Sequence, residues 1–61
     1  MKLYDIPKDS KIYAECSDDS TYFIFNHIDG AFSHCTTEKG GIAHLGASQD
    51  LEEYKDGYKL K

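Results

Sequence analysis

The stretch TYFIFNHIDGAFSHCTT, residues 21–37, decides the fold, because it has the pattern of a complete β-hairpin. Runs rich in β-branched and aromatic residues flank Asp29-Gly30, the pair that best tolerates the positive φ angles of a two-residue type I′ loop. We therefore predict an antiparallel hairpin that turns at this pair. The expected register places Ile28 opposite Ala31, His27 opposite Phe32, Phe25 opposite His34 and Ile24 opposite Cys35.

Both faces of this predicted hairpin carry apolar side chains, since successive residues of a strand point to opposite sides. One face can fill the core of the protein. The other then needs a cover, which is the rest of a curled sheet, a second subunit or a ligand. The first predicted face holds Tyr22, Ile24, Ile28, Ala31 and Cys35, and the second holds Phe23, Phe25, His27, Phe32, His34 and Thr36.

The rest of the chain predicts further short strands separated by turns. We expect strands at residues 1–4, 11–15 and 42–45 beside the hairpin strands at 21–28 and 31–37, polar turns at 17–20 and 38–41, and an irregular link with one helical turn at 46–53. In the last segment, residues 54–60, a tight turn at Asp56-Gly57 is expected to leave Tyr58 to Leu60 as a closing strand that pairs near the N-terminus. The prediction is a single domain over residues 1–61, mostly β, forming a small antiparallel curled sheet of five to six strands or an SH3-like barrel.

Size and composition favour a folded chain that assembles with copies of itself. Hydrophobic residues make up 39% of the 61 residues, which is too many for a disordered chain. A domain this small buries only about 60% of its unfolded surface, so its own core gives marginal stability. Pairing of edge strands between subunits would add to it, and we expect a homo-oligomer.

The charge balance limits the choice of partner. The net charge is −4, with seven Lys and no Arg, which argues against long DNA or RNA as the main partner. A mononucleotide or dinucleotide carries few charges, and two lysines with backbone N–H groups would be enough to bind it. No apolar run approaches the roughly 18 residues that span a membrane, so no membrane partner is expected.

The cysteines and histidines are the candidates for metal or catalytic chemistry. The sequence lacks an apolar leader of signal-peptide type, so we expect reduced Cys16 and Cys35 in a cytoplasmic protein, with one disulfide as the alternative if both face the core. No close ligand pair of the C-x-x-C or H-x3-H kind is present. We predict no metal site and no cofactor, although zinc favours the residue types of His27, His34, Cys35 and His44.

A Cys/His nucleophile pair is the catalytic alternative. Such a pair needs an orienting third group, an oxyanion hole and a cleft, which a chain of this length can hardly build alone. We therefore predict that the protein is not an enzyme.

A binding surface made of aromatic rings and small hydrogen-bond donors is the third hypothesis, besides a metal site and a catalytic pair. Aromatic side chains stack on bases, and hydroxyl, imidazole and ammonium groups bind phosphate. Tyrosine is enriched among the residues that anchor protein interfaces. The candidate ligand-binding residues are Phe25, Phe32, His34, Thr36 and Lys39, and the candidate interface residues are Tyr13, Tyr22, Tyr54 and Tyr58.

One pattern extends over nearly the whole chain and comprises Ile6-Pro7-Lys8-Asp9-Ser10-Lys11, His27-Ile28-Asp29-Gly30, Phe32, Cys35, His44-Leu45 and Asp56-Gly57-Tyr58. This pattern resembles small uncharacterised proteins encoded by tailed bacteriophages. It consists mainly of turn and strand residues, so it implies a shared fold more than a shared activity. The resemblance further implies a location in the cytoplasm of the infected bacterial host and a role in host takeover or anti-defence by binding.

These observations lead to three functional hypotheses. The first is a non-catalytic phage accessory protein that sequesters a small nucleotide-type immune signal, as a homo-oligomer with its site between subunits. The second is an inhibitor that binds a host protein, either of defence or of housekeeping. The third is a small virion or assembly protein.

Overall fold

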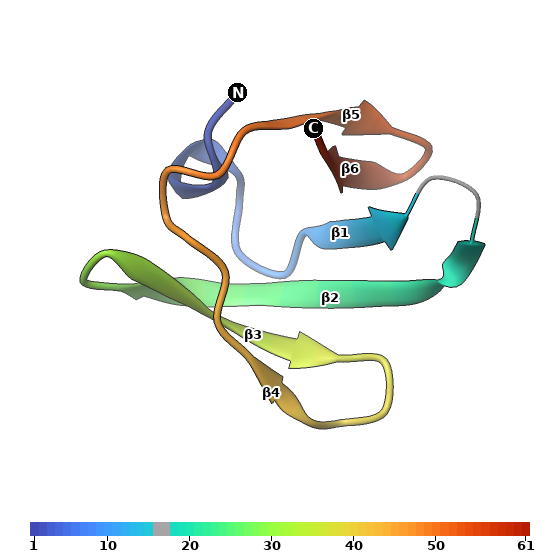
Figure 1. Ribbon diagram of the computed structural model, residues 1–61, viewed down its shortest axis with the longest axis horizontal. Helices are drawn as coiled ribbons and strands as arrows, with labels where there is room; N and C mark the ends of the chain where they lie inside the picture. The colour runs from blue at the N-terminus through green and yellow to red at the C-terminus, as the bar shows by residue number, and fades with distance from the viewer. Residues whose placement is uncertain (16–17) are drawn as a thin grey trace.

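The computed structural model describes residues 1–15 and 18–61 and shows a mostly β fold, which confirms the predicted curled sheet (Figure 1). One six-stranded sheet has the order β4-β3-β2-β1-β6-β5, so β4 and β5 are its open edges and the closed-barrel alternative does not form. The elements are a short 3-10 helix η1 (Leu3–Asp5) and the strands β1 (Lys11–Glu15), β2 (Asp18–Asp29), β3 (Phe32–Thr37), β4 (Ile42–Ala43), β5 (Leu51–Tyr54) and β6 (Gly57–Leu60).

The sheet is mixed. β6 pairs with β1, as expected for a closing strand, but the two strands run parallel, while the other pairs of neighbours are antiparallel. Alternation of apolar and polar residues is the same in either direction, so the sequence pattern did not fix the direction of β6. At Gly57 the two strands come close together, and an added Cβ would lie 2.3 Å from the carbonyl oxygen of Lys11.

The β2–β3 hairpin forms as predicted, but its turn and register are different. The loop is Gly30-Ala31, because Asp29 pairs with Phe32 and only Gly30 of the two loop residues has a positive φ, 65°. A single positive φ at the first loop position is the pattern of a type II′ turn, in which Gly-X is favoured. The predicted type I′ turn at Asp29-Gly30 is therefore wrong by one residue.

A β-bulge at Asn26 changes which side chains share a face. Before the bulge in the sequence Phe25 pairs with Cys35, and after it His27 pairs with His34. An extra residue in one strand shifts the alternation of everything beyond it. The predicted pairs of Phe25 with His34 and of Ile24 with Cys35 are thus wrong, and so is the division of the hairpin into the two predicted faces.

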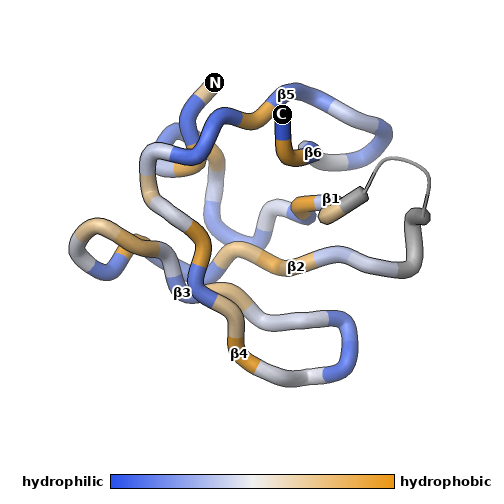
Figure 2. Tube along the Cα trace, in the orientation of Figure 1, coloured by the Kyte–Doolittle hydropathy of each residue, from blue (hydrophilic) through white to orange (hydrophobic). Residues whose placement is uncertain are grey.

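The inner face of the sheet carries the core. Figure 2 shows hydrophobic positions on β1, β2 and β6 and in the link after β4. Phe25 and Cys35, a cross-strand pair, are 5% and 0% exposed. The buried core consists of Leu3, Ile6, Ile12, Phe25, Cys35 and Leu51, with Phe23, Ala43, Leu45, Tyr58 and Leu60 packed against it.

The N-terminal segment and the link between β4 and β5 lie side by side across this core (Figure 1). The amide of Leu3 donates to the carbonyl of Gln49 at 2.9 Å, and the amide of Leu51 donates to the carbonyl of Met1 at 2.7 Å. These long-range bonds satisfy main-chain groups that an isolated segment would leave to water. They place Leu3 and Leu51, both essentially unexposed, against the inner face.

Several predicted element boundaries need correction. The strand expected at 1–4 is replaced by η1 from Leu3 onward, because the amides of Leu3 and Tyr4 bond to the β4–β5 link. Only Met1 and Lys2 pair in an extended manner, with residues 50–51 at the start of β5. The strand expected at 42–45 ends at Ala43, and β5 occupies part of the expected irregular link. β2 begins at Asp18, within the expected 17–20 turn, while Cys16 and Ser17 of that region lie outside the described residues.

Candidate functional site

The outer face of the β2–β3 hairpin carries most of the predicted ligand-binding residues. Phe32, His34 and Thr36 alternate along β3, so all three point away from the core. The burial pattern agrees, since the intervening Ser33 and Cys35 are both 0% exposed. Three of the five predicted ligand-binding residues therefore share one surface.

Three histidines meet on this outer face and are called the histidine row below: His27, His34 and His44. The rings of His27 and His34 are stacked, with centroids 5.0 Å apart and an interplanar angle of 7°. His44 meets His34 edge to face, with centroids 5.6 Å apart. His27 comes from β2, His34 from β3, and His44 follows β4 directly, so neighbouring segments of the sheet each contribute one imidazole.

Hydrogen bonds fix the orientation of two of these rings. The Nδ2 of Asn26 lies 3.1 Å from Nδ1 of His34 and donates to the Thr36 hydroxyl at 2.9 Å. Because an amide NH₂ only donates, the neutral His34 ring accepts at Nδ1 and carries its proton on Nε2. Nδ1 of His44 lies 3.1 Å from the Ser33 carbonyl, which only accepts, so the His44 proton is on Nδ1.

Two exposed apolar side chains flank the histidine row. Phe32 is 58% exposed, and Ile42 on the edge strand β4 is 57% exposed. Ile42 pairs with Thr36 across β3 and β4, which places its side chain on the outer face as well. Together with the histidine row, Asn26 and Thr36, these two residues form what we call the histidine face.

Phe25 and Lys39, the other predicted ligand-binding residues, are placed differently. Phe25 is 5% exposed in the core, because the bulge at Asn26 turns it to the inner face, so its ring is not available on the histidine face. Lys39 is exposed in the turn between β3 and β4, at the end of the same pair of strands.

Four residues of the histidine face were not predicted from the sequence as parts of a ligand-binding surface: Asn26, His27, Ile42 and His44. An asparagine within an otherwise apolar strand was the available signal, since such a residue is unfavourable in a strand interior and marks irregular pairing. The position of His44 depends on how residues 42–46 lie against β3, which the sequence did not determine.

Three of the four predicted interface tyrosines gather elsewhere on the sheet, and we call them the tyrosine cluster: Tyr13, Tyr22 and Tyr54. Tyr13 meets Tyr54 edge to face at 5.1 Å, and Tyr22 lies 6.5 Å away on the other side. The ammonium of Lys11 lies 4.3 Å from the ring centre of Tyr22 and 4.9 Å from that of Tyr13, within cation–π range.

Tyr13 is the centre of this cluster and is only 3% exposed, so its ring offers little free surface. Its hydroxyl donates to the Asp56 carboxylate at 2.5 Å. This hydrogen bond raises the pKa of Tyr13 and lowers the pKa of Asp56, because it stabilises the phenol and the carboxylate together. The fourth tyrosine, Tyr58, lies on the inner face and packs against the core.

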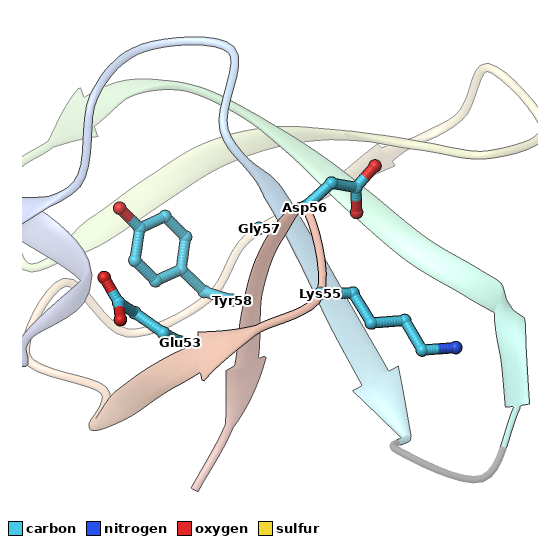
Figure 3. Close-up of a pocket in the computed structure, with 5 residues that line it drawn as sticks. All are labelled: Glu53, Lys55, Asp56, Gly57 and Tyr58. Carbon is cyan, nitrogen blue, oxygen red and sulfur yellow. The ribbon is translucent and has the colours of Figure 1, made fainter.

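A hollow of about 340 Å³ lies at the β5–β6 turn, away from the predicted ligand-binding residues. Figure 3 shows Glu53 and Tyr58 on one side of the turn, with Lys55 and Asp56 extending in other directions. The lining side chains therefore do not converge on one point, and two of them are carboxylates. Of the predicted interface residues, only Tyr58 lines this hollow.

The sheet separates the Cys35 thiol from the imidazoles. Cys35 is a free, fully buried cysteine on the inner face, 3.4 Å from the Ser33 hydroxyl, whereas the histidine row lies on the outer face. Within residues 1–15 and 18–61, no group of three or more His, Cys, Asp or Glu side chains is arranged to hold a metal ion.

Comparison with protein families, with curated proteins and with solved structures finds no match to this chain. In the described part of the chain, none of the helices has the length and apolar character needed to cross a membrane. The fold class is therefore established by the structure alone, as a small, mostly β domain with one curled mixed sheet.

Proposed function

We propose that this chain is a non-catalytic binding protein that takes up a small nucleotide-type ligand on its histidine face. One observation carries the proposal: Phe32, His34 and Thr36 alternate along β3 and form a line of ring, imidazole and hydroxyl on an outer face. A regular strand holds these groups at fixed spacing, which favours recognition of a rigid, flat ligand.

The chemistry of the line suits a base joined to a phosphate. Phe32 offers a ring that is 58% exposed, and base–aromatic stacking contributes about 1–3 kcal/mol per base. The Nε2–H of His34 and the Thr36 hydroxyl supply hydrogen bonds beside it. Lys39, at the end of the β3–β4 hairpin, adds a positive charge to an otherwise acidic protein.

A second copy of the chain is expected to complete the site. The histidine face is open, and small-molecule sites are generally concave and enclose most of the ligand. β4 is a short edge strand, and pairing across such an edge is a common route to a symmetric dimer. In the phage context implied by the sequence resemblance, such a homo-oligomer would sequester a nucleotide signal of host immunity in the bacterial cytoplasm.

Binding of a host protein is the second candidate, favoured by the exposed apolar side chain of Ile42 on the edge strand. An extended segment of a partner can add to an open sheet edge, where main-chain bonds give affinity and exposed side chains give selectivity. This candidate predicts a stable complex that forms without any nucleotide.

Native mass spectrometry with a panel of cyclic and linear nucleotides tests the first candidate. We expect a homo-oligomer that retains one of these nucleotides in stoichiometric amount, and loss of the bound mass in Phe32→Ala. Tyr4→Ala is the matched control, because Tyr4 is an equally exposed aromatic residue, at 54%, outside the histidine face. Retention by Phe32→Ala, or no bound nucleotide in the unaltered protein, would contradict the proposal.

A further inference from the structure

We propose that the histidine row binds the phosphate group of the ligand and takes up protons as it does so. This inference rests on the proposed function, since it assigns one part of the ligand to one part of the histidine face. It is carried by the position of three imidazoles on one exposed surface and by the hydrogen bonds that fix their protons.

The three rings are close enough to contact one tetrahedral anion or to repel one another. Successive centroids lie 5.0 and 5.6 Å apart. His27 and His44 are exposed and His34 is half-buried, so the row is accessible from solvent. Histidine is also the side chain whose ordinary pKa, about 6.5, lies closest to neutral pH.

The proton positions explain why anion binding and proton uptake are coupled. In the neutral row, His34 has an N–H at Nε2, but His44 uses its N–H on the Ser33 carbonyl and has only a lone pair at Nε2. A phosphate oxygen accepts hydrogen bonds and cannot contact a lone pair favourably. Protonation of His44 adds a second N–H without disturbing its bond to Ser33, so an anion favours the charged ring.

The charges around the row allow this coupling. Asp29, which carries a carboxylate, lies two residues beyond His27 on the same side of β2. Residues 32–37 of β3 and 42–47 after the turn contain no other charged group, and the turn between them holds Glu38 and Lys39. Lys11 of β1 pairs with Ile24, further along β2. Without an anion, adjacent imidazolium groups would repel each other, most strongly in the stacked His27–His34 pair.

The linkage has a definite sign. A bound anion raises the pKa of the imidazoles it contacts, so binding is strongest below the pKa of the free protein and weakens as pH rises toward the pKa of the complex. For one proton taken up, affinity falls by about tenfold per pH unit within that window.

A sulfate titration followed by NMR tests the inference directly. Sulfate resembles phosphate but keeps one charge state over this range, and the chain has only three histidines, so every imidazole signal reports the row. We expect sulfate to shift these signals at pH 6.5, to raise their apparent pKa values, and to bind about tenfold more weakly at pH 7.5. Sodium chloride at equal ionic strength is the salt control.

Two variants sharpen the test. His44→Gln keeps a hydrogen-bonding side chain but cannot take up a proton, so we expect weaker sulfate binding with less pH dependence. Lys8→Ala removes an exposed positive charge from the turn before β1 and should bind sulfate as the unaltered protein does. Equal binding by His44→Gln, or a response of the imidazoles to zinc chloride but not to sulfate, would overturn the inference.

The outcomes separate this inference from the proposed function. Nucleotide binding that is independent of pH and unaffected by His44→Gln would support the proposed function and show that the histidine row takes no part in it. Proton-coupled sulfate binding without retention of any nucleotide would support the anion site and contradict the nucleotide proposal.

Discussion

Replacement of Gly57 by alanine is the sharpest test of how the sheet is assembled. Gly57 begins β6, and a Cβ added there would lie 2.3 Å from the Lys11 carbonyl oxygen and 3.0 Å from its carbon. Contacts below 3.0 Å are essentially never observed for a real Cβ, so β1 and β6 would have to separate by at least about 0.7 Å. The obstacle is backbone rather than a flexible side chain, so it cannot move aside alone.

We expect Gly57→Ala to destabilise the protein by about 1–3 kcal/mol, the usual cost of forcing extra volume into a packed structure. For a domain of this size, 1 kcal/mol corresponds to about 4–8 °C in Tm, so the expected decrease is roughly 5–20 °C. Thermal and urea unfolding followed by circular dichroism measure it. A chain of 61 residues has a small free energy of unfolding, so a destabilisation at the upper end of this range should leave the protein partly unfolded at 37 °C.

Gly46→Ala is the matched control. A Cβ at Gly46 has nothing within 4 Å, and the backbone of neither glycine has a positive φ, so the two substitutions differ mainly in the steric contact. Gly46→Ala should unfold near the temperature of the unaltered protein. If Gly57→Ala also unfolds there, the close approach of β6 to β1 is not present in solution and the reasoning fails.

Two further predictions concern hydrogen bonds. Ser33→Ala should lower the free energy of unfolding in urea by about 1–3 kcal/mol, because the buried hydroxyl bonds both the carbonyl and the amide of Leu45 in the β4–β5 link. Ser48→Ala, at an exposed position, should leave the stability unchanged. Equal stability of the two variants would show that the link is not anchored at Ser33. Asp56→Asn should lower the pKa of Tyr13, seen as earlier phenolate absorbance in an alkaline titration, while Glu38→Gln should not. The stabilisation from this hydrogen bond is full between about pH 4 and pH 10. It is lost below that range as Asp56 is protonated and above it as Tyr13 ionises. An unchanged Tyr13 titration in Asp56→Asn would contradict the hydrogen bond between these two side chains.

The hairpin and most strands were predictable because they depend on local alternation and turn chemistry. The strand at 11–15 was predicted with its observed bounds, and the 21–28 strand lies wholly within β2. The register was not predictable, since Asp29-Gly30 and Gly30-Ala31 are both acceptable loops and the alternation of residues cannot reveal a bulge. Asn26 alone reverses the face of Phe25 relative to His27.

The candidate site was predicted where it depends on a single regular strand. Phe32, His34 and Thr36 share a face because β3 has no bulge, so their alternation was sufficient. The histidine row was not predicted as one surface, because it requires the correct β2–β3 register and the return of the chain along β3 after Ile42. Tyr13 and Tyr54 meet only because β6 brings the β5–β6 hairpin beside β1, a contact between distant parts of the sequence.

An NMR titration of the isotopically labelled protein with the nucleotide panel reports where a ligand binds as well as whether it binds. We expect one nucleotide to shift the resonances of Phe32, His34 and Thr36 and to leave those of the hollow at the β5–β6 turn unchanged. Shifts confined to Glu53, Lys55 and the rest of that hollow, or no shifts with any nucleotide, would contradict this expectation.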